Sequence, residues 1–240
     1  MPELVLSVFP GIDLLGRAFE EEGFCVVRGP DVLWGGDIHT FHPPAGVFDG
    51  VIGGPPCQSF SVTRNMLDAQ GIPPEFGNLI PEFERVISEA RPKWFVMENV
   101  AKAPCPHVTD YLVESGVFDN RLFGASQHRE RLICVGRRGQ SSHTLHLLFM
   151  EWSSINGEWK HTVTARHQGA RRERTKGDTV WYSIPDAIEV QGLPSSFLEG
   201  APLTRQGKLK AIANGVPLPM GRAIARAIKR AMEADRAEAR

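Results

Sequence analysis

Strand-like and helix-like patterns alternate through the first 136 residues, and this alternation constrains the fold more than any other feature. Short apolar runs typical of buried strands occur at residues 4–9 (LVLSVF), 24–27 (FCVV), 48–53 (FDGVIG), 94–100 (WFVMENV) and 131–136 (RLICVG). Between them, apolar residues recur at helical spacing, as in residues 14–19 after the candidate N-cap Asp13 and in residues 78–90. Strands joined by crossover helices predict a parallel or mostly parallel sheet, so we expect an α/β fold.

The pattern changes at about residue 137. Periodicity is poor through residues 138–183, where tryptophan, histidine, glycine and arginine dominate, and a clear helical pattern returns at residues 216–232. A chain of 240 residues can form one α/β domain with a small appendage. We therefore expect a sheet domain over residues 1–137, an irregular region over residues 138–183, and a C-terminal part over residues 184–240 whose helix packs back on the sheet.

Charge and cysteine usage exclude several classes of protein. The net charge is −1, so a case for nucleic-acid binding must come from local clusters. The four cysteines are widely spaced without a C-x-x-C pair, which argues against a disulfide framework and a zinc site and fits a reducing compartment. No apolar run approaches ~18 residues, and the first residues lack a basic region and a cleavage site. We expect a cytoplasmic protein with neither a membrane partner nor a bound metal.

One cysteine lies in a loop that is poorly suited to a core. The stretch at residues 51–61 (VIGGPPCQSFS) ends an apolar strand with two glycines and two prolines, and Cys57 follows directly. Open α/β sheets bind their ligands at the carboxyl ends of strands. A free cysteine is more often a small buried side chain, but the prolines and the polar neighbours here favour a nucleophile.

Other polar groups follow strands in the same way. A glycine turn at residues 9–16 (FPGIDLLG) joins the first strand to a helix, a position where a nucleoside cofactor can approach the backbone, although the G-x-G-x-x-G pattern is absent. Asp37 is suited to an adenine amino group or a ribose hydroxyl, or is a simple turn residue. Glu98 ends an apolar strand. Gln127, Arg129 and Arg131 alternate and share one face, either as a solvated edge or as a clamp for an anion or carbonyl.

Together these motifs closely resemble the S-adenosylmethionine-dependent cytosine-5 DNA methyltransferase family. Seven segments follow the family's blocks in order over most of the chain: FPGIDLLG, GDI, GGPPCQSFS, MENV, QHRERLICVG, IEVQGLP and ANGVPLP. The resemblance implies a Rossmann-like class I methyltransferase sheet with a small, reduced target-recognition region, matching residues 1–137 and 138–183. It also implies a bacterial or phage-encoded DNA (cytosine-5)-methyltransferase.

The resemblance assigns the chemistry to four side chains. Cys57 would add as a thiolate to carbon 6 of a cytosine. Glu98 would hydrogen-bond ring nitrogen 3 and the amino group, while Arg131 would hold the carbonyl at position 2 with Arg129 in support. Carbon 5 would then take the methyl group of S-adenosylmethionine, and loss of a proton and of Cys57 would release 5-methylcytosine. The target base must first be flipped out of the duplex.

The cofactor contacts implied by the resemblance come from the ends of strands and from one C-terminal turn. They are Phe9, Pro10, Gly11, Ile12, Asp31, Asp37, Ile38, Pro55, Leu79, Asn214 and Val216. Two departures from the family are visible. Pro30 stands near the place of its ribose-binding acidic residue, with Asp31 next, and the short distance from Asp31 to Asp37 indicates that the usual intervening helix is deleted. Pro185 and Asp186 stand where the family has an Arg-Glu pair.

Contacts to double-stranded DNA are expected from the cysteine loop, the QHRER block and a basic segment at residues 164–176. They are Gln58, Ser59, Ser61, Gln127, Arg166, Arg171, Arg172 and Arg174. The basic segment contains a single acidic residue, so we favour phosphate binding over the alternative of a solvated face. Only residues 138–160 are left as freely variable recognition sequence. The sequence therefore predicts a short or degenerate target of about two to four base pairs.

Three other functions stay open at this point. The first is the same chemistry on RNA, and the second is an inactive relative that binds DNA, which the presence of Cys57, Glu98 and Arg131 disfavours. A cysteine hydrolase is the third, but none of the eight histidines is recognisably paired with Cys57. A homodimer is left open, and no restriction endonuclease partner is evident.

Overall fold

A computed structural model describes residues 2–56, 77–139, 146, 151, 160, 162–163, 171–174 and 179–238, with the backbone alone at residues 171–174, 179–181 and 238. In the described parts of the chain, no helix is both long and apolar enough to cross a membrane. Cys57, Gln58, Ser59, Ser61 and Arg166 lie outside the described residues.

A six-stranded sheet forms the centre of the fold, in the order β2-β1-β3-β4-β6-β5. Its strands are β1 (Leu4–Val8), β2 (Cys25–Arg28), β3 (Gly50–Gly53), β4 (Trp94–Asn99), β5 (Tyr111–Asp119) and β6 (Glu130–Arg138). The first four are parallel, whereas β6 is antiparallel to both β4 and β5. The expected mostly parallel sheet is confirmed.

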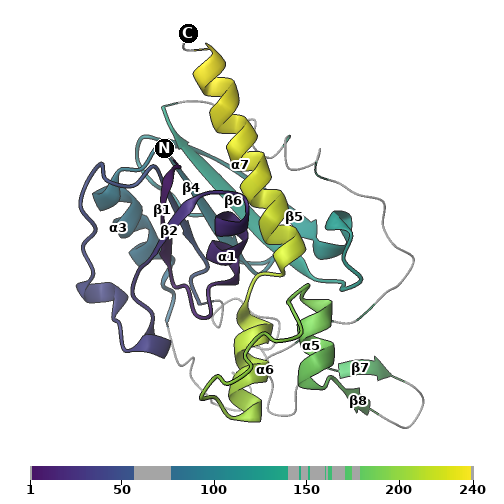
Figure 1. The fold of residues 1–240 in the computed structure, drawn as a ribbon. Helices are drawn as coiled ribbons and strands as arrows, with labels where there is room; N and C mark the ends of the chain where they lie inside the picture. Colours follow the sequence, from purple (N-terminus) through teal and green to yellow (C-terminus); the bar gives the residue numbers. More distant parts are fainter. Residues whose placement is uncertain are drawn as a thin grey trace.

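Helices cover both faces of this sheet because its strands are apolar on both faces. Helices α1 (Leu14–Glu21) and α7 (Leu218–Glu238) pack on one face, where Phe19 and Ile224 join the cluster around Val5 and Ile52. On the other face, α3 (Ile80–Ala90) contributes to a second cluster that includes Phe83 and Phe95. The C-terminal helix therefore packs back on the sheet, as its sequence pattern predicts (Figure 1).

A smaller helical region lies beyond the carboxyl ends of the parallel strands (Figure 1). It contains α5 (Ile184–Val190), α6 (Arg205–Asn214) and a two-stranded sheet of β7 (Arg171–Arg174) and β8 (Thr179–Trp181). Leu14 and Ala18 of α1 share a third apolar cluster with α5 and α6. The unusual Pro185 and Asp186 have a local reason, since Asp186 forms a capping box with Ser183 and Pro185 occupies the first turn of α5.

The connection between β2 and β3 is made without an α-helix. Two 3₁₀ turns, η1 (Val32–Trp34) and η2 (Ile38–Thr40), occupy it instead, as the spacing from Asp31 to Asp37 indicates. Asp31 is the N-cap of η1 and Asp37 is the N-cap of η2. Both acidic side chains therefore cap short turns, and Asp31 also contacts the turn that follows β1.

Candidate active site

A buried ion pair joins β4 to the start of β6. Arg131 Nε lies 2.8 Å from Glu98 Oε1, and Glu98 is only 8 % exposed. The antiparallel register sets Asn99 opposite Leu132, so Arg131, the second residue of β6, lies beside the end of β4. A paired charge is the form in which a buried carboxylate is tolerated. The structure thus brings together two of the side chains that the sequence assigns to chemistry.

The loop that leads to Cys57 begins against this pair. Gly54 lies so close that a Cβ atom there would be 3.2 Å from Glu98 Oε2, tighter than almost all real contacts of this kind. Asn99, which is 2 % exposed, donates through Nδ2 to the carbonyl of Pro55 over 3.2 Å. The entry to the loop is therefore fixed at two successive residues, with Glu98 directly beneath it. Sequence reasoning did not assign a role to Asn99.

Asp13 organises the glycine turn after β1. Its carboxylate accepts hydrogen bonds from Ser7 Oγ (2.7 Å) and the Gly16 amide (3.1 Å), and pairs with Arg28 Nε at 2.8 Å. Burial raises the pKa of Asp13, while the Ser7 and Arg28 contacts act in the opposite direction. A Cβ atom at Gly16 would lie 2.3 Å from this carboxylate, so only glycine fits there. Asp13 is thus the N-cap that the sequence predicts.

The turn leaves open space beside the Cα atom of Gly11. Gly11 has a φ of 55°, and a Cβ atom there would meet nothing within 4 Å. Phe9, at a φ of 54°, is half-buried against the α3 side of the sheet, and Pro10 and Ile12 are also half-buried. Open space at a glycine in the same turn as an aromatic residue fits the nucleoside part of S-adenosylmethionine.

Asp31 and Trp34 contact the same turn from η1. Asp31 Oδ2 accepts from the Gly11 amide at 2.9 Å, and its Oδ1 accepts from the Leu33 amide at 2.8 Å. Trp34 donates through Nε1 to the Gly11 carbonyl at 2.8 Å while remaining 70 % exposed. Asp31 therefore lies beside the expected cofactor region despite its departure from the family pattern. Trp34 was missed because its contact spans 23 positions of sequence.

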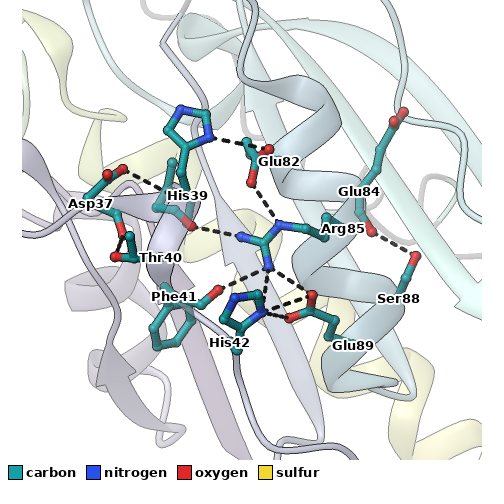
Figure 2. Close-up of polar contacts among 11 residues, drawn as sticks. Asp37, His39, Thr40, Phe41, His42, Glu82, Glu84, Arg85, Ser88 and Glu89 are labelled. Atoms are coloured by element: carbon teal, nitrogen blue, oxygen red, sulfur yellow. Dashed lines mark hydrogen bonds and ion pairs between the residues drawn. The ribbon is translucent and has the colours of Figure 1, made fainter.

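The backbone of η2 is held by Arg85, an arginine of α3 (Figure 2). Arg85 donates to the carbonyls of Ile38 (2.7 Å) and Phe41 (3.0 Å) and pairs with Glu82 (2.8 Å). It also pairs with Glu89 at 2.9 Å, and the hydrogen bond from Arg85 holds the pKa of Glu82 below its ordinary value. The exposed Asp37 caps η2 by accepting from the His39 amide at 3.0 Å. Sequence reasoning missed Arg85, whose helical position gives no sign of this contact.

Arg129 is buried against backbone carbonyls of distant segments. It is 2 % exposed, and its guanidinium donates to the carbonyls of Ala213 (2.7 Å), Gly215 (3.3 Å) and Val163 (3.2 Å). These bonds fix the turn that carries the exposed Asn214 and the buried Val216 to the start of β6. Three hydrogen bonds from Arg129 go to backbone oxygens, and its support of Arg131 at a substrate carbonyl stays a prediction.

The other residues predicted to contact the cofactor or DNA differ in how far they are buried. Gln127 has no exposed area in the absence of DNA, and its contact with DNA stays a prediction. Pro55 is buried, and Leu79 is the half-buried N-cap of α3. Arg171, Arg172 and Arg174 lie on β7, which pairs with β8.

Comparison with known proteins agrees with this geometry. The sequence model of the C-5 cytosine-specific DNA methylases matches residues 35–104. The Type II methyltransferase M.NgoFVII of Neisseria gonorrhoeae is 36% identical over 165 residues, covering 56% of this chain and 43% of that protein. The Type II methyltransferase M.FnuDI of Fusobacterium nucleatum is 37% identical over 165 residues, covering 56% of this chain and 46% of that protein. The chain spans less than half the length of these relatives.

Solved structures show the fold at lower identity. The Dnmt2 methyltransferase of S. pombe superposes with a TM-score of 0.69 at 10% identity, covering 96% of this chain and 99% of that one. A putative DNA modification methyltransferase from an E. coli prophage superposes with a TM-score of 0.64 at 14% identity. The match covers 97% of this chain and 100% of that one. The expected Rossmann-like methyltransferase fold is confirmed. Over residues 35–104 the chain is similar to the C-5 cytosine-specific DNA methylases.

Proposed function

We propose that this protein is a DNA (cytosine-5)-methyltransferase that acts through a covalent Cys57 adduct on a flipped cytosine. The observation that carries the proposal is the buried Glu98–Arg131 pair under the entry to the Cys57 loop. A base delivered to this position would meet a thiol, a carboxylate and a guanidinium together. Such preorganised charge is the main source of rate acceleration in enclosed sites. The bacterial relatives support DNA as the substrate and the cytoplasm as the location.

In the proposed reaction the Cys57 thiolate forms a bond to carbon 6 of the cytosine, which makes carbon 5 nucleophilic. Glu98 has one oxygen paired to Arg131 and the other facing Gly54, so the second oxygen is directed toward the loop. Nitrogen 3 takes up a proton as carbon 6 is attacked, so that its N–H and the amino group both donate to the Glu98 carboxylate, while Arg131 donates to the carbonyl at position 2. Carbon 5 takes the methyl group and S-adenosylhomocysteine is released. Water then removes the carbon 5 proton, the carbon 6–sulfur bond breaks to restore the thiolate, and nitrogen 3 gives up its proton.

S-adenosylmethionine, when bound, supplies the electrophilic methyl group. The residues proposed to hold it surround the open glycine turn and the neighbouring strand ends. Phe9 packs on the adenine and the Gly11 backbone lies along the nucleoside. Asp37 takes the adenine amino group, and Asp31 lies within reach of the ribose through its contact with the Gly11 amide. Asn214 closes the site from the turn that Arg129 fixes.

Tritiated methyl transfer from S-adenosylmethionine tests this function, with duplex DNA and transfer RNA as alternative acceptors. We expect label in DNA, bisulfite-resistant cytosines at the labelled positions, and loss of both with Cys57→Ser. The matched control is Cys25→Ser, which removes an exposed thiol on β2 and should leave transfer unchanged. Label in transfer RNA alone would replace the DNA function by the RNA one. Binding of DNA without any transfer would identify an inactive relative.

A further inference from the structure

Two cysteines distant in sequence meet outside the proposed active site. Cys134 Sγ lies 3.2 Å from Cys105 Sγ, although the residues are 29 positions apart. Neither thiol has a role in the proposed methyl transfer. We propose that Cys105 and Cys134 form a peroxide-responsive disulfide, so that this pair is a reversible oxidation site of the folded protein.

The local structure holds the two sulfurs together. Cys134 is wholly buried in β6, opposite Met97 of β4. The segment around Cys105 is anchored to the same apolar cluster by Ala103 and Val108, which are 8 % and 4 % exposed. Prolines at positions 104 and 106 fix the backbone on both sides of Cys105.

A second anchor comes from α3. The His107 amide donates to Glu84 Oε1 at 2.6 Å, which ties the segment to the helix two residues after Cys105. The thiol contact is thus a product of the fold, with anchors before and after Cys105. A small approach of the two sulfurs would bring them to bonding distance, which is about 2.05 Å in a disulfide.

The two thiols have different environments, and this sets the order of the reaction. Cys105 is exposed, so an oxidant can reach its sulfur. Burial, together with the hydrogen bond to Cys105, raises the pKa of Cys134 and keeps it a thiol. Cys105 is therefore the sulfur that is attacked first, and Cys134 is the resolving partner.

The chemistry balances with hydrogen peroxide as the oxidant. The Cys105 thiolate attacks one peroxide oxygen, the O–O bond breaks, hydroxide leaves, and Cys105 becomes a sulfenic acid. The Cys134 sulfur then attacks the Cys105 sulfur, displacing the sulfenic oxygen as water once the Cys134 proton is transferred. The pair has lost two electrons in total, and a dithiol reductant returns both thiols by exchange.

The test uses the full chain treated with one equivalent of hydrogen peroxide in the folded state. Remaining thiols are blocked with iodoacetamide, the protein is denatured and digested, and peptides are compared with and without dithiothreitol. We expect a linked Cys105–Cys134 peptide that disappears on reduction. Running the same experiment on Cys57→Ser removes the proposed nucleophile, and the link should still form because it does not depend on methyl transfer.

Two variants make the result decisive. Cys105→Ser changes an exposed side chain and should leave Cys134 alkylatable only after denaturation, with no new cross-link. Cys25→Ser removes the exposed cysteine of β2 and should leave the Cys105–Cys134 link intact. Formation of a sulfinic acid at Cys105 without a link would overturn the proposal. So would a link that appears only when the chain is oxidised after denaturation.

Discussion

Glu98 stands between two fixed groups, with Arg131 on one of its oxygens and the backbone of Gly54 over the other. Its carboxylate is therefore largely shielded from water, with only 8 % of the residue exposed. A side chain held in this way contributes through charge and hydrogen bonding at one place, which is what stabilisation of a developing charge requires. Its function should be sensitive to charge even when size and shape are kept.

The first prediction is that Glu98→Gln retains binding of S-adenosylmethionine but lowers kcat about 10²- to 10³-fold, since one preorganised electrostatic contact is lost. Calorimetry measures the binding and single-turnover transfer measures the rate. Glu130→Gln is the matched control, because it makes the same charge change at an exposed neighbour of Arg131. A variant at position 98 with near wild-type turnover would show that the base does not bind against this carboxylate.

Asp119 has a structural task at the start of β6. It caps η3 (Asn120–Phe123), pairs with Arg121 at 2.7 Å and His128 Nδ1 at 2.6 Å, and accepts from the Arg129 amide at 3.1 Å. Burial alone would raise the pKa of Asp119, but these hydrogen bonds lower it from 3.8 to about 2. A carboxyl group whose pKa falls on folding stabilises the native state above its unfolded pKa.

The second prediction follows from the lowered pKa of Asp119 in the folded state. Asp119→Asn should lower the thermal midpoint by several degrees near neutral pH, and the difference from wild type should shrink as the pH falls through the window between 3.8 and about 2. Thermal unfolding followed by circular dichroism at a series of pH values measures this. A difference that stays constant from pH 6 to pH 3 would assign the stabilisation to packing instead.

At the scale of elements, α3 does more than cover the sheet. Through Arg85 it fixes the backbone of η2, and His39 and His42 add contacts to Glu82 and Glu89 on the same helix (Figure 2). The segment that begins with Asp37 is thereby attached to the helix at several points. A side chain on α3 can in this way determine the position of the backbone of η2.

The third prediction is that Arg85→Met weakens binding of S-adenosylmethionine about tenfold while leaving kcat at saturation nearly unchanged. The reason is that the backbone of η2 loses two hydrogen bonds, whereas the Glu98–Arg131 pair keeps its contact. The control is Ser88→Ala on the same helix, which removes only a hydroxyl bonded to the Glu84 carbonyl. Titration calorimetry and steady-state kinetics provide the two readouts. A fall in kcat as large as the loss of affinity would mean that the Arg85 contacts affect the whole sheet.

Elements were predictable where their signal is local. The apolar runs of β1, β3, β4 and β6 and the helical spacing in α3 and α7 identify themselves within about ten residues of sequence. The absence of a helix between Asp31 and Asp37 was predictable from their separation. Contacts that depend on the packing of distant segments could not be predicted in this way. They include the contacts of Arg85, of Arg129 and of the Cys105–Cys134 pair.

Arg129 illustrates why a motif alone does not give a role. The spacing of the QHRER block sets Arg129 and Arg131 on one face, and that much is local. Arg131 reaches Glu98, whereas Arg129 reaches carbonyls of residues more than thirty and eighty positions away. The difference depends on where the C-terminal turn packs, and no short stretch of sequence contains that information.

At the scale of the whole molecule, the chain leaves the sheet at the end of β6 and contacts the residues just before β6 again at Lys160. Lys160 pairs with Gln127 in an isolated parallel bridge, and the His128 amide donates to its carbonyl at 2.9 Å. Val163 then accepts from Arg129. These contacts support the proposal that residues 138–160 are the freely variable part of the recognition region, and each specified base pair needs at least one well-held side chain.

The fourth prediction is therefore a short or degenerate target of about two to four specified base pairs. Phosphate contacts from the basic segment at residues 164–176 should add affinity that falls with salt and is independent of sequence. Methylome sequencing of cells expressing the protein gives the target sequence. DNA binding measured at several salt concentrations gives the salt dependence of the affinity. A strict six-base site read by a monomer would contradict this account.

The central claim is that Cys57 attacks carbon 6 of a cytosine, and a duplex containing 5-fluorocytosine tests it most directly. Fluorine at carbon 5 cannot leave as a proton does, so the methylated adduct persists. We predict that wild-type protein incubated with this duplex and S-adenosylmethionine forms a denaturation-resistant complex through Cys57, and that Cys57→Ser binds the duplex without forming it. Equal adduct formation by Cys57→Ser, or methylated cytosine with no adduct in the wild type, would contradict the account.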